Sequence, residues 1–194
     1  MIKSNLNLSK DWKSNGAIYV KGYLFNKRNE LIKEGRLIDY FKSIENFETN
    51  LKEANGSFAV IIILDDIILI GVDKLRTIPV FYSFSNSEIR ISDNAQKIKE
   101  DLNLKKLNSK ALFEFKQSLF VSNNDTLVES LKQLDGGQYI KVIRDSEYFI
   151  AKYYHYYVRK YEFANLNQKE AFTMIWNISK DVFTRLIESV NGKT

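Results

Sequence analysis

The chain has 194 residues, a net charge of +5 and no cysteine. The lack of cysteine excludes disulfides, thiolate metal sites and a cysteine nucleophile. No apolar run is long enough to span a membrane, and the lysines are spread along the sequence rather than interleaved with stacking aromatic residues, so we expect neither a membrane nor a nucleic-acid partner. Length and composition favour one sizeable core in a soluble, cytoplasmic protein.

The amino-terminal part predicts an arm, a strand and a helix. Residues 1–15 are polar, which predicts a loosely held arm. Three apolar residues are expected to anchor this arm to a sheet, namely Leu6, Leu8 and Trp12. Residues 17–26 alternate around Gly22 and predict a strand with a close backbone approach or a bulge at that glycine. Between Gly35 and Ala54, apolar residues recur at helical spacing and predict one helix that is broken near Asn46.

The most apolar part of the sequence, residues 55–93, predicts two hairpins. Val60–Leu64 and Ile67–Ile70 are short runs of Val, Ile and Leu separated by two aspartates, which is typical of buried strands joined by a tight turn. Val80–Phe84 and Glu88–Ser92 predict a second hairpin. We expect the four strands to form one meander.

The remaining elements are helices and a last hairpin. Residues 94–102 predict a short helix, and residues 109–120 predict another that begins with Ser109 as its N-cap. Residues 138–143 and 147–154 predict two strands, and Asn167–Val190 predicts a long amphipathic helix. Its apolar stripe indicates burial against a second body, although packing against the chain's own sheet is an open alternative.

The central stretch and a later turn resemble the N-terminal glutaminase domain of the asparagine synthase family. The family pattern reads Asn-Gly-x-Phe-Ala, then Arg-Asp-Arg-x-Gly, then a basic residue before Pro-Leu-Tyr-Tyr, and later Leu-Pro-x-Gly-x-Tyr. The residues of this chain that match the pattern are Asn55, Gly56, Phe58, Ala59, Asp73, Pro79, Tyr82 and Gly137. The chain departs from the pattern at Val72, Arg76 and Ile78.

The resemblance implies a fold and a domain order. The fold is an α+β, αββα sandwich of two antiparallel sheets, of the class II glutamine amidotransferase (Ntn-hydrolase) type, incomplete at its amino end. Residues 1–154 correspond to the glutaminase-like domain. Residues 155–194 correspond to a linker and the helix that leads toward an ATP-dependent synthetase domain, so the chain is expected to be a fragment of a longer protein.

The positions that perform the family's reaction are altered in this sequence. Ile2 stands where active members have a cysteine whose thiol attacks glutamine while the free amine acts as base. Lys21-Gly22 stands where the family has Asn-Gly, which stabilises the oxyanion. Gly35-Arg36 stands where a Gly-Ser-Asp segment holds the glutamine amino group, and Arg36 would repel that group. Asp73 and Lys74, in the segment that corresponds to the family's Arg-Asp-Arg-x-Gly stretch, are further positions of this vestigial site.

These substitutions predict a non-catalytic domain of an asparagine-synthase-related, amide-forming protein. No cofactor is expected in this chain, and ATP and Mg²⁺ are expected only in a following synthetase domain, which would be its partner. His155, the single histidine, predicts no metal site because it lacks ligand neighbours in the sequence. A homodimer through an exposed sheet edge is a further expectation.

Two other functions remain open at the level of the sequence. One is a stand-alone scaffold or protein-interaction module that uses the closing helix as its interface. The other is an amidohydrolase with an unforeseen nucleophile, which would release ammonia from glutamine.

Overall fold

The computed structural model describes residues 3–85, 88–143, 148–156 and 165–190. The strands are β1 (Lys3–Asn7), β2 (Lys13–Ser14), β3 (Ile18–Phe25), β4 (Leu31–Lys33), β5 (Asn55–Ile63), β6 (Ile67–Val72), β7 (Phe81–Ser85), β8 (Glu88–Ser92), β9 (Lys132–Gln133), β10 (Gln138–Ile143) and β11 (Tyr148–Lys152). The helices are α1 (Arg36–Phe41), α2 (Phe47–Glu53), α3 (Ala95–Asp101), α4 (Ser109–Ser118) and α5 (Gln168–Val190).

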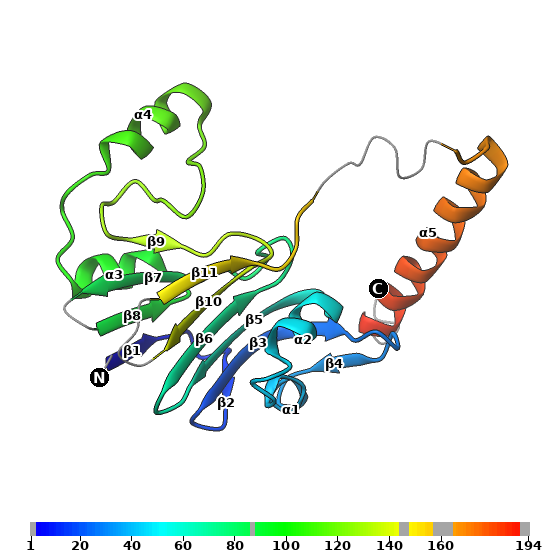
Figure 1. Ribbon diagram of the computed structural model, residues 1–194, viewed down its shortest axis with the longest axis horizontal. Coiled ribbons are helices and arrows are strands. Elements are labelled where there is room, and N and C mark those ends of the chain that lie inside the picture. Colours follow the sequence, from blue (N-terminus) through cyan, green and yellow to red (C-terminus); the bar gives the residue numbers. More distant parts are fainter. Residues whose placement is uncertain (1–2, 86–87, 144–147, 157–164, 191–194) are drawn as a thin grey trace.

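The strands form two sheets that pack face to face, with helices on their outer surfaces (Figure 1). One sheet has the order β11-β10-β6-β5-β3-β2, with β4 paired to β3, and the other has the order β1-β8-β7-β9. Helices α1 and α2 cover the outer face of the larger sheet, and α3 lies against β7 and β8. The expected α+β architecture of two stacked sheets is confirmed.

The two central hairpins lie in different sheets, so the expected four-stranded meander is wrong. β5 pairs with β6 in the larger sheet, while β7 pairs with β8 in the smaller one. The segment between β6 and β7 carries the chain from one sheet to the other, and β10 takes the place beside β6. A meander needs a short reversal between neighbouring strands, whereas Asp73–Val80 folds into a compact loop that crosses to the opposite layer.

The amino-terminal arm is a strand rather than a loosely held segment. β1 pairs in parallel with β8, from Lys3 opposite Glu88 to Asn7 opposite Ser92. The smaller sheet is therefore not wholly antiparallel. Trp12 is buried and Leu6 packs against the core, so the expected apolar anchors are confirmed.

The alternation of side chains along β5 divides the interior into two cores. Ala59 and Ile61 face the smaller sheet, where they pack with a cluster that includes Tyr82 and Ile91. Val60 and its neighbour two residues on, Ile62, face the opposite way. The aliphatic and aromatic side chains that meet them come largely from α1 and α2, namely Leu37, Phe41, Phe47 and Leu51. A strand buried on both faces reads as a continuous apolar run because both sets of side chains leave water.

The helical region after β4 is broken where the sequence predicts a break. α1 ends at Phe41 and α2 begins after Asn46, whose backbone angles (φ −94°, ψ 6°) leave the helical range. The start of α4 differs slightly from expectation, because its N-cap is Asn108, whose side chain accepts a hydrogen bond from the Ala111 N–H. Asparagine and serine are equally good N-caps, so sequence alone does not choose between neighbours.

Gly22 marks a close backbone approach between β3 and β5. Its φ is +98°, and a Cβ at this position would lie 2.0 Å from the Ser57 carbonyl oxygen. The pairing of β3 with β5 continues through this point without an extra residue, from Lys21 opposite Ala59 to Tyr23 opposite Ser57. The close approach is therefore confirmed and a bulge is excluded.

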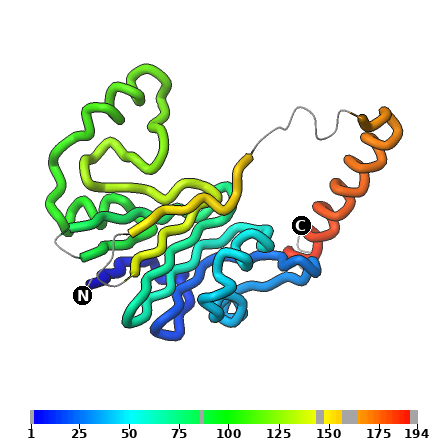
Figure 2. The backbone as a smooth tube through the Cα atoms, viewed as in Figure 1, coloured from blue at the N-terminus to red at the C-terminus, as the bar shows by residue number. Residues whose placement is uncertain are grey.

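Helix α5 extends away from the sandwich and contacts it near its carboxyl end (Figure 2). None of its side chains is buried. The alternative in which the apolar stripe packs against the chain's own sheet is therefore wrong for this structure.

Candidate functional site

The residues that the family resemblance assigns to a vestigial substrate site lie in three separate parts of the structure. Lys21 and Gly22 lie on β3, Asp73 and Lys74 follow β6, and Arg36 begins α1. Gly22 lies between the first two places, because Phe58 pairs with Gly22 across the sheet and also donates its N–H to the Asp73 carboxylate at 3.3 Å.

The Asp93 carboxylate is the centre of a cluster that joins the arm to both sheets. The Ser9 N–H donates to it at 3.1 Å, the Ser9 hydroxyl at 2.5 Å and the Trp12 indole N–H at 3.0 Å. The Lys21 ammonium lies 3.5 Å from the same carboxylate and donates to Ser9 Oγ at 3.1 Å. On its exposed side, Lys21 also lies 3.4 Å from Asp11.

The pKa of Asp93 is lowered by this environment. Burial by itself would raise the pKa of this carboxyl, but the hydrogen bonds from Ser9 and Trp12, together with the Lys21 charge, outweigh the effect of burial. The carboxylate is therefore a weak base at neutral pH.

Serine, lysine and aspartate meet in this cluster, but their hydrogen bonds do not activate a nucleophile. The Ser9 hydroxyl donates to Asp93, which is a weak base, and accepts from Lys21, whose ammonium lies within ion-pair distance of Asp11 and Asp93. A serine nucleophile needs a neighbouring base that can take its proton. The Lys21 ammonium already forms ion pairs with Asp11 and Asp93. The geometry therefore favours a structural connection between the two sheets over an oxyanion site.

Asp73 organises the loop between the two sheets. It is 1% exposed, and its carboxylate accepts hydrogen bonds from the Leu75 N–H at 2.9 Å, the Thr77 N–H at 3.0 Å and the Thr77 hydroxyl at 2.6 Å. Its backbone carbonyl accepts the Gly137 N–H at 3.0 Å. The hydrogen bonds from the loop thus satisfy a carboxylate that is almost fully buried, and they hold the loop in its tight conformation.

Lys74 is half-buried between this loop and the segment after β11. Its ammonium lies 5.3 Å from the centre of the Tyr154 ring, a cation–π contact. Burial lowers the pKa of Lys74. The adjacent turn is equally close-packed, since a Cβ on Gly136 would lie 2.8 Å from the Lys74 carbonyl oxygen and one on Gly137 would lie 2.7 Å from that of Tyr154.

The third place, Gly35-Arg36, does not join the other two. Both residues are exposed at the start of α1, and no described hydrogen bond or ion pair involves the Arg36 side chain. Ile2, the position that corresponds to the family's nucleophile, lies outside the residues that the structure describes. The structure therefore does not assemble the expected positions into one substrate site within its described part.

The residues of the family pattern serve mainly the core. Phe58, Ala59 and Tyr82 are almost fully buried, and burial raises the pKa of Tyr82. Gly56 allows close approach, because a Cβ there would lie 2.4 Å from the Tyr23 carbonyl oxygen. Pro79 directly precedes the buried Val80, outside β7, where no ladder hydrogen bond is required of it. Asn55 is the exposed exception at the start of β5.

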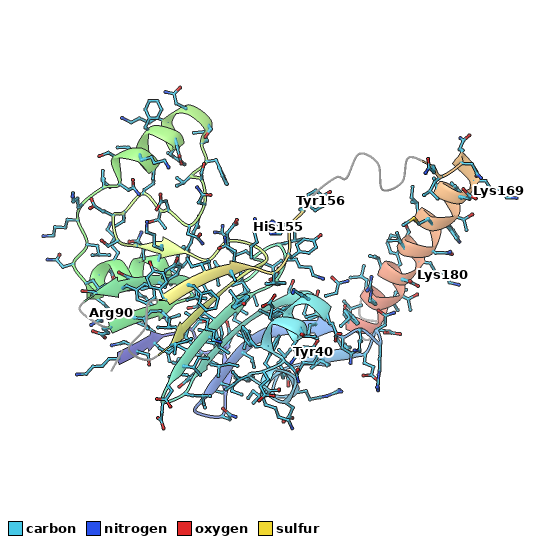
Figure 3. All side chains as sticks on the ribbon, viewed as in Figure 1. Tyr40, Arg90, His155, Tyr156, Lys169 and Lys180 are labelled. Carbon is cyan, nitrogen blue, oxygen red and sulfur yellow. The ribbon has the colours of Figure 1, made fainter. Side chains whose placement is uncertain are left out.

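Among residues 3–85, 88–143, 148–156 and 165–190, no group of three or more His, Asp or Glu side chains is placed to hold a metal ion. Within the same ranges, no helix has the length and apolar character needed to cross a bilayer. His155 and Tyr156 lie on the segment that leaves the sandwich after β11 (Figure 3).

Comparison with known proteins adds one distant likeness. No protein-family model and no curated protein matches the chain. Among solved structures, the chain is similar to a glutamine phosphoribosylpyrophosphate (PRPP) amidotransferase from B. subtilis complexed with ADP and GMP, with a TM-score of 0.45 and 7% sequence identity. The match covers 73% of this chain and 30% of that chain. A likeness this distant shows nothing about activity or ligands.

Sequence reasoning missed Asp93 and Ser9, which are the best-connected polar residues near Lys21. The sequence offers a partial signal, because Trp12 is a large apolar residue in a polar arm and predicts an anchor point. It offers none for Asp93, which reads as an ordinary polar residue between a strand and a helix.

Proposed function

We propose that the chain is a non-catalytic, glutaminase-like domain that docks through α5 on an ATP-dependent domain that forms carbon–nitrogen bonds, as the resemblance to asparagine synthases implies. The observation that carries this proposal is the exposure of α5. Phe172 is 69% exposed, Trp176 63% and Phe183 62%, on a helix without any buried side chain. Large aromatic side chains exposed together in this way mark an interaction surface.

The charges on α5 favour a protein partner over a membrane surface. Its polar residues include three basic and three acidic side chains, namely Lys169, Lys180 and Arg185 against Glu170, Asp181 and Glu188. Helices that lie on anionic membranes carry an excess of basic residues on the polar face. Lys169 and Lys180 extend to the side of α5 that faces away from the sandwich (Figure 3). A partner surface with an apolar centre and carboxylates at its rim would complement them.

The residues around Lys21 support the lack of catalysis. The chain has no cysteine, and the Ser9 hydroxyl donates to the Asp93 carboxylate, whose lowered pKa makes it a weak base for activating a nucleophile. ATP and Mg²⁺ would belong to the partner domain, which would take its nitrogen from ammonia, an amine or another subunit.

Two measurements test this proposal. The purified chain is incubated with glutamine, and release of ammonia is followed with a coupled dehydrogenase. We expect a rate equal to that of buffer, and turnover at an ordinary enzymatic rate would refute the absence of catalysis. Docking is measured by sedimentation velocity with the asparagine-synthase-type synthetase domains of the source organism. A Trp176→Ser/Phe183→Ser variant should lose the complex, while Lys52→Gln on α2 should keep it.

A stand-alone interaction module is the second candidate, because the same exposed helix would serve it. It predicts a complex with a protein that does not use ATP, and no complex with any synthetase domain. Sedimentation of the chain alone also tests the expected homodimer, since a single species of 22.7 kDa at high concentration would exclude it.

A further inference from the structure

A pocket of about 260 Å³ lies where the carboxyl-terminal half of α5 approaches the sandwich. Six residues define its chemistry: Tyr23, Phe25, Asn55, Arg185, Leu186 and Ser189. The strand residues come from the paired ends of β3 and β5, where Phe25 lies opposite Asn55. This face of α5 is separate from the face that carries Lys169 and Lys180, which point away from the sandwich (Figure 3).

The pocket contains one cationic side chain and no acidic one. The Arg185 guanidinium carbon lies 5.9 Å from the centre of the Phe25 ring, and one of its nitrogens donates to the Asn29 side-chain oxygen at 3.3 Å. No carboxylate in the described part of the chain forms an ion pair with Arg185. Guanidinium presents five donors in a planar fork, so donors remain for a second planar acceptor.

The other polar groups at the pocket can also donate hydrogen bonds. Within the described residues, no hydrogen bond involves the Asn55 amide or the Tyr23 hydroxyl, and each can donate to an anion. Tyr23 and Phe25 meet edge to face with 6.2 Å between ring centres, which provides an apolar wall. A site with aromatic walls and donors around one cation is complementary to an anion that carries an apolar body.

We propose that this pocket binds a small carboxylate with an aromatic or aliphatic body, held by Arg185 and packed against Phe25. The guanidinium pairs with the carboxylate as two parallel N–H···O bonds, and Asn55 or Tyr23 donates a third hydrogen bond. Because the pocket is formed between α5 and the sandwich, an occupant would also hold α5 against the ends of β3 and β5, leaving its outer aromatic face free for a partner. The inference does not depend on which partner that face binds.

The experiment titrates the full chain with sodium phenylacetate and follows backbone amide shifts by NMR. Phenylacetamide, which has nearly the same shape and no charge, is titrated in parallel. We expect the amides of Asn55 and Gly56 to shift, and phenylacetate to bind at least about tenfold more tightly than phenylacetamide, as a charge-assisted pair requires.

Three variants make the result specific to Arg185. Arg185→Gln should lose the preference for phenylacetate while binding of phenylacetamide stays unchanged, which shows that the pocket is intact. Arg185→Lys should keep part of the preference, because lysine keeps the charge and loses the fork. Lys180→Gln, which removes an outward-facing charge of the same helix, should change neither affinity. Equal binding of the two ligands, or an unchanged preference in Arg185→Gln, would overturn the proposal.

Discussion

The Lys21 ammonium lies 3.5 Å from the Asp93 carboxylate, and this ion pair joins the two sheets of the sandwich. Lys21 belongs to β3 of the larger sheet, and Asp93 directly follows β8 of the smaller one. Ser9 and Trp12 donate to the same carboxylate, so the arm, which begins with β1, is fixed at the same point. Lys21, which the sequence resemblance aligns with an oxyanion position, thus connects the two layers in this structure.

Removing the Asp93 carboxylate should therefore destabilise the whole chain. Asp93→Ala leaves the Trp12 N–H, the Ser9 groups and Lys21 without their acceptor, and we expect the free energy of unfolding to fall by about 2–4 kcal/mol. Urea denaturation followed by circular dichroism measures the change. Asp11→Ala is the matched control, since Asp11 is 76% exposed and its pair with Lys21 is worth less than about 1 kcal/mol. Equal losses in the two variants would contradict the role of Asp93.

The same carboxylate should make stability depend on acid pH. The pKa of Asp93 in the folded chain lies below its ordinary value of 3.8, because hydrogen bonds and the Lys21 charge outweigh the opposing effect of burial. The unfolded state therefore binds the proton first, and the stabilisation is present above pH 3.8 and lost as pH falls from there through the folded pKa. We compare the free energy of unfolding at about pH 6 with that at about pH 3. The decrease between the two pH values should be smaller for Asp93→Asn than for the natural sequence. An identical loss would mean that Asp93 does not titrate as described.

The Asp73 loop should be similarly sensitive to one substitution. Asp73→Ala removes the acceptor of the Phe58, Leu75 and Thr77 N–H groups, of which the Phe58 hydrogen bond is buried and the other two are partly buried. We expect the free energy of unfolding to fall by about 3 kcal/mol. Thr77→Val removes only the hydrogen bond from the Thr77 hydroxyl to Asp73, and the free energy of unfolding should fall by about 1 kcal/mol. The control is Asp39→Ala on the exposed side of α1, which should cost less than about 1 kcal/mol. A loss for Asp73→Ala no larger than that of the control would be inconsistent with the hydrogen bonds seen here.

Gly16 and Gly22 have nearly the same positive φ, so alanine substitutions at these two positions separate the effect of backbone strain from that of a steric clash of the added Cβ. Gly22 has φ +98° and Gly16 has φ +96°, but only at Gly22 would a Cβ collide, 2.0 Å from the Ser57 oxygen, while nothing lies within 4 Å at Gly16. Gly16→Ala should cost about 1 kcal/mol through backbone strain alone. In Gly22→Ala the added Cβ would also displace β5, so the free energy of unfolding should fall by at least about 3 kcal/mol, or the chain should not fold. Similar melting temperatures for the two variants would show that β3 and β5 are not this close.

The two tryptophans should report separately on the core and on α5. Trp12 is 8% exposed and Trp176 is 63% exposed. Trp12→Phe leaves only Trp176, whose fluorescence should be red-shifted and strongly quenched by acrylamide, whereas Trp176→Phe should leave a blue-shifted, weakly quenched signal. A protected Trp176 in the chain alone would contradict the exposure of α5, and its protection on addition of a synthetase domain would support the proposed docking.

Sequence patterns located most of the elements and left open how they are assembled. Unbroken β-branched runs predict β5 and β6, and apolar spacing predicts the break between α1 and α2, because both depend on residues a few positions apart. The resemblance to glutaminase-like domains drew attention to Lys21, Asp73 and Lys74 but implied a shared site. Long-range packing placed them in different settings.

What the sequence determined by itself is the position and type of the local structure, the core faces of the central strands and the absence of cysteine. Tertiary structure alone decided that the second hairpin belongs to the opposite sheet, that the arm adds a parallel strand, and that Asp93 meets Lys21. The physical reason is that backbone preferences and apolar alternation depend on neighbouring residues in the sequence. The choice of strand partner and of ion-pair partner depends instead on distant residues, which come together only when both faces of β5 are buried.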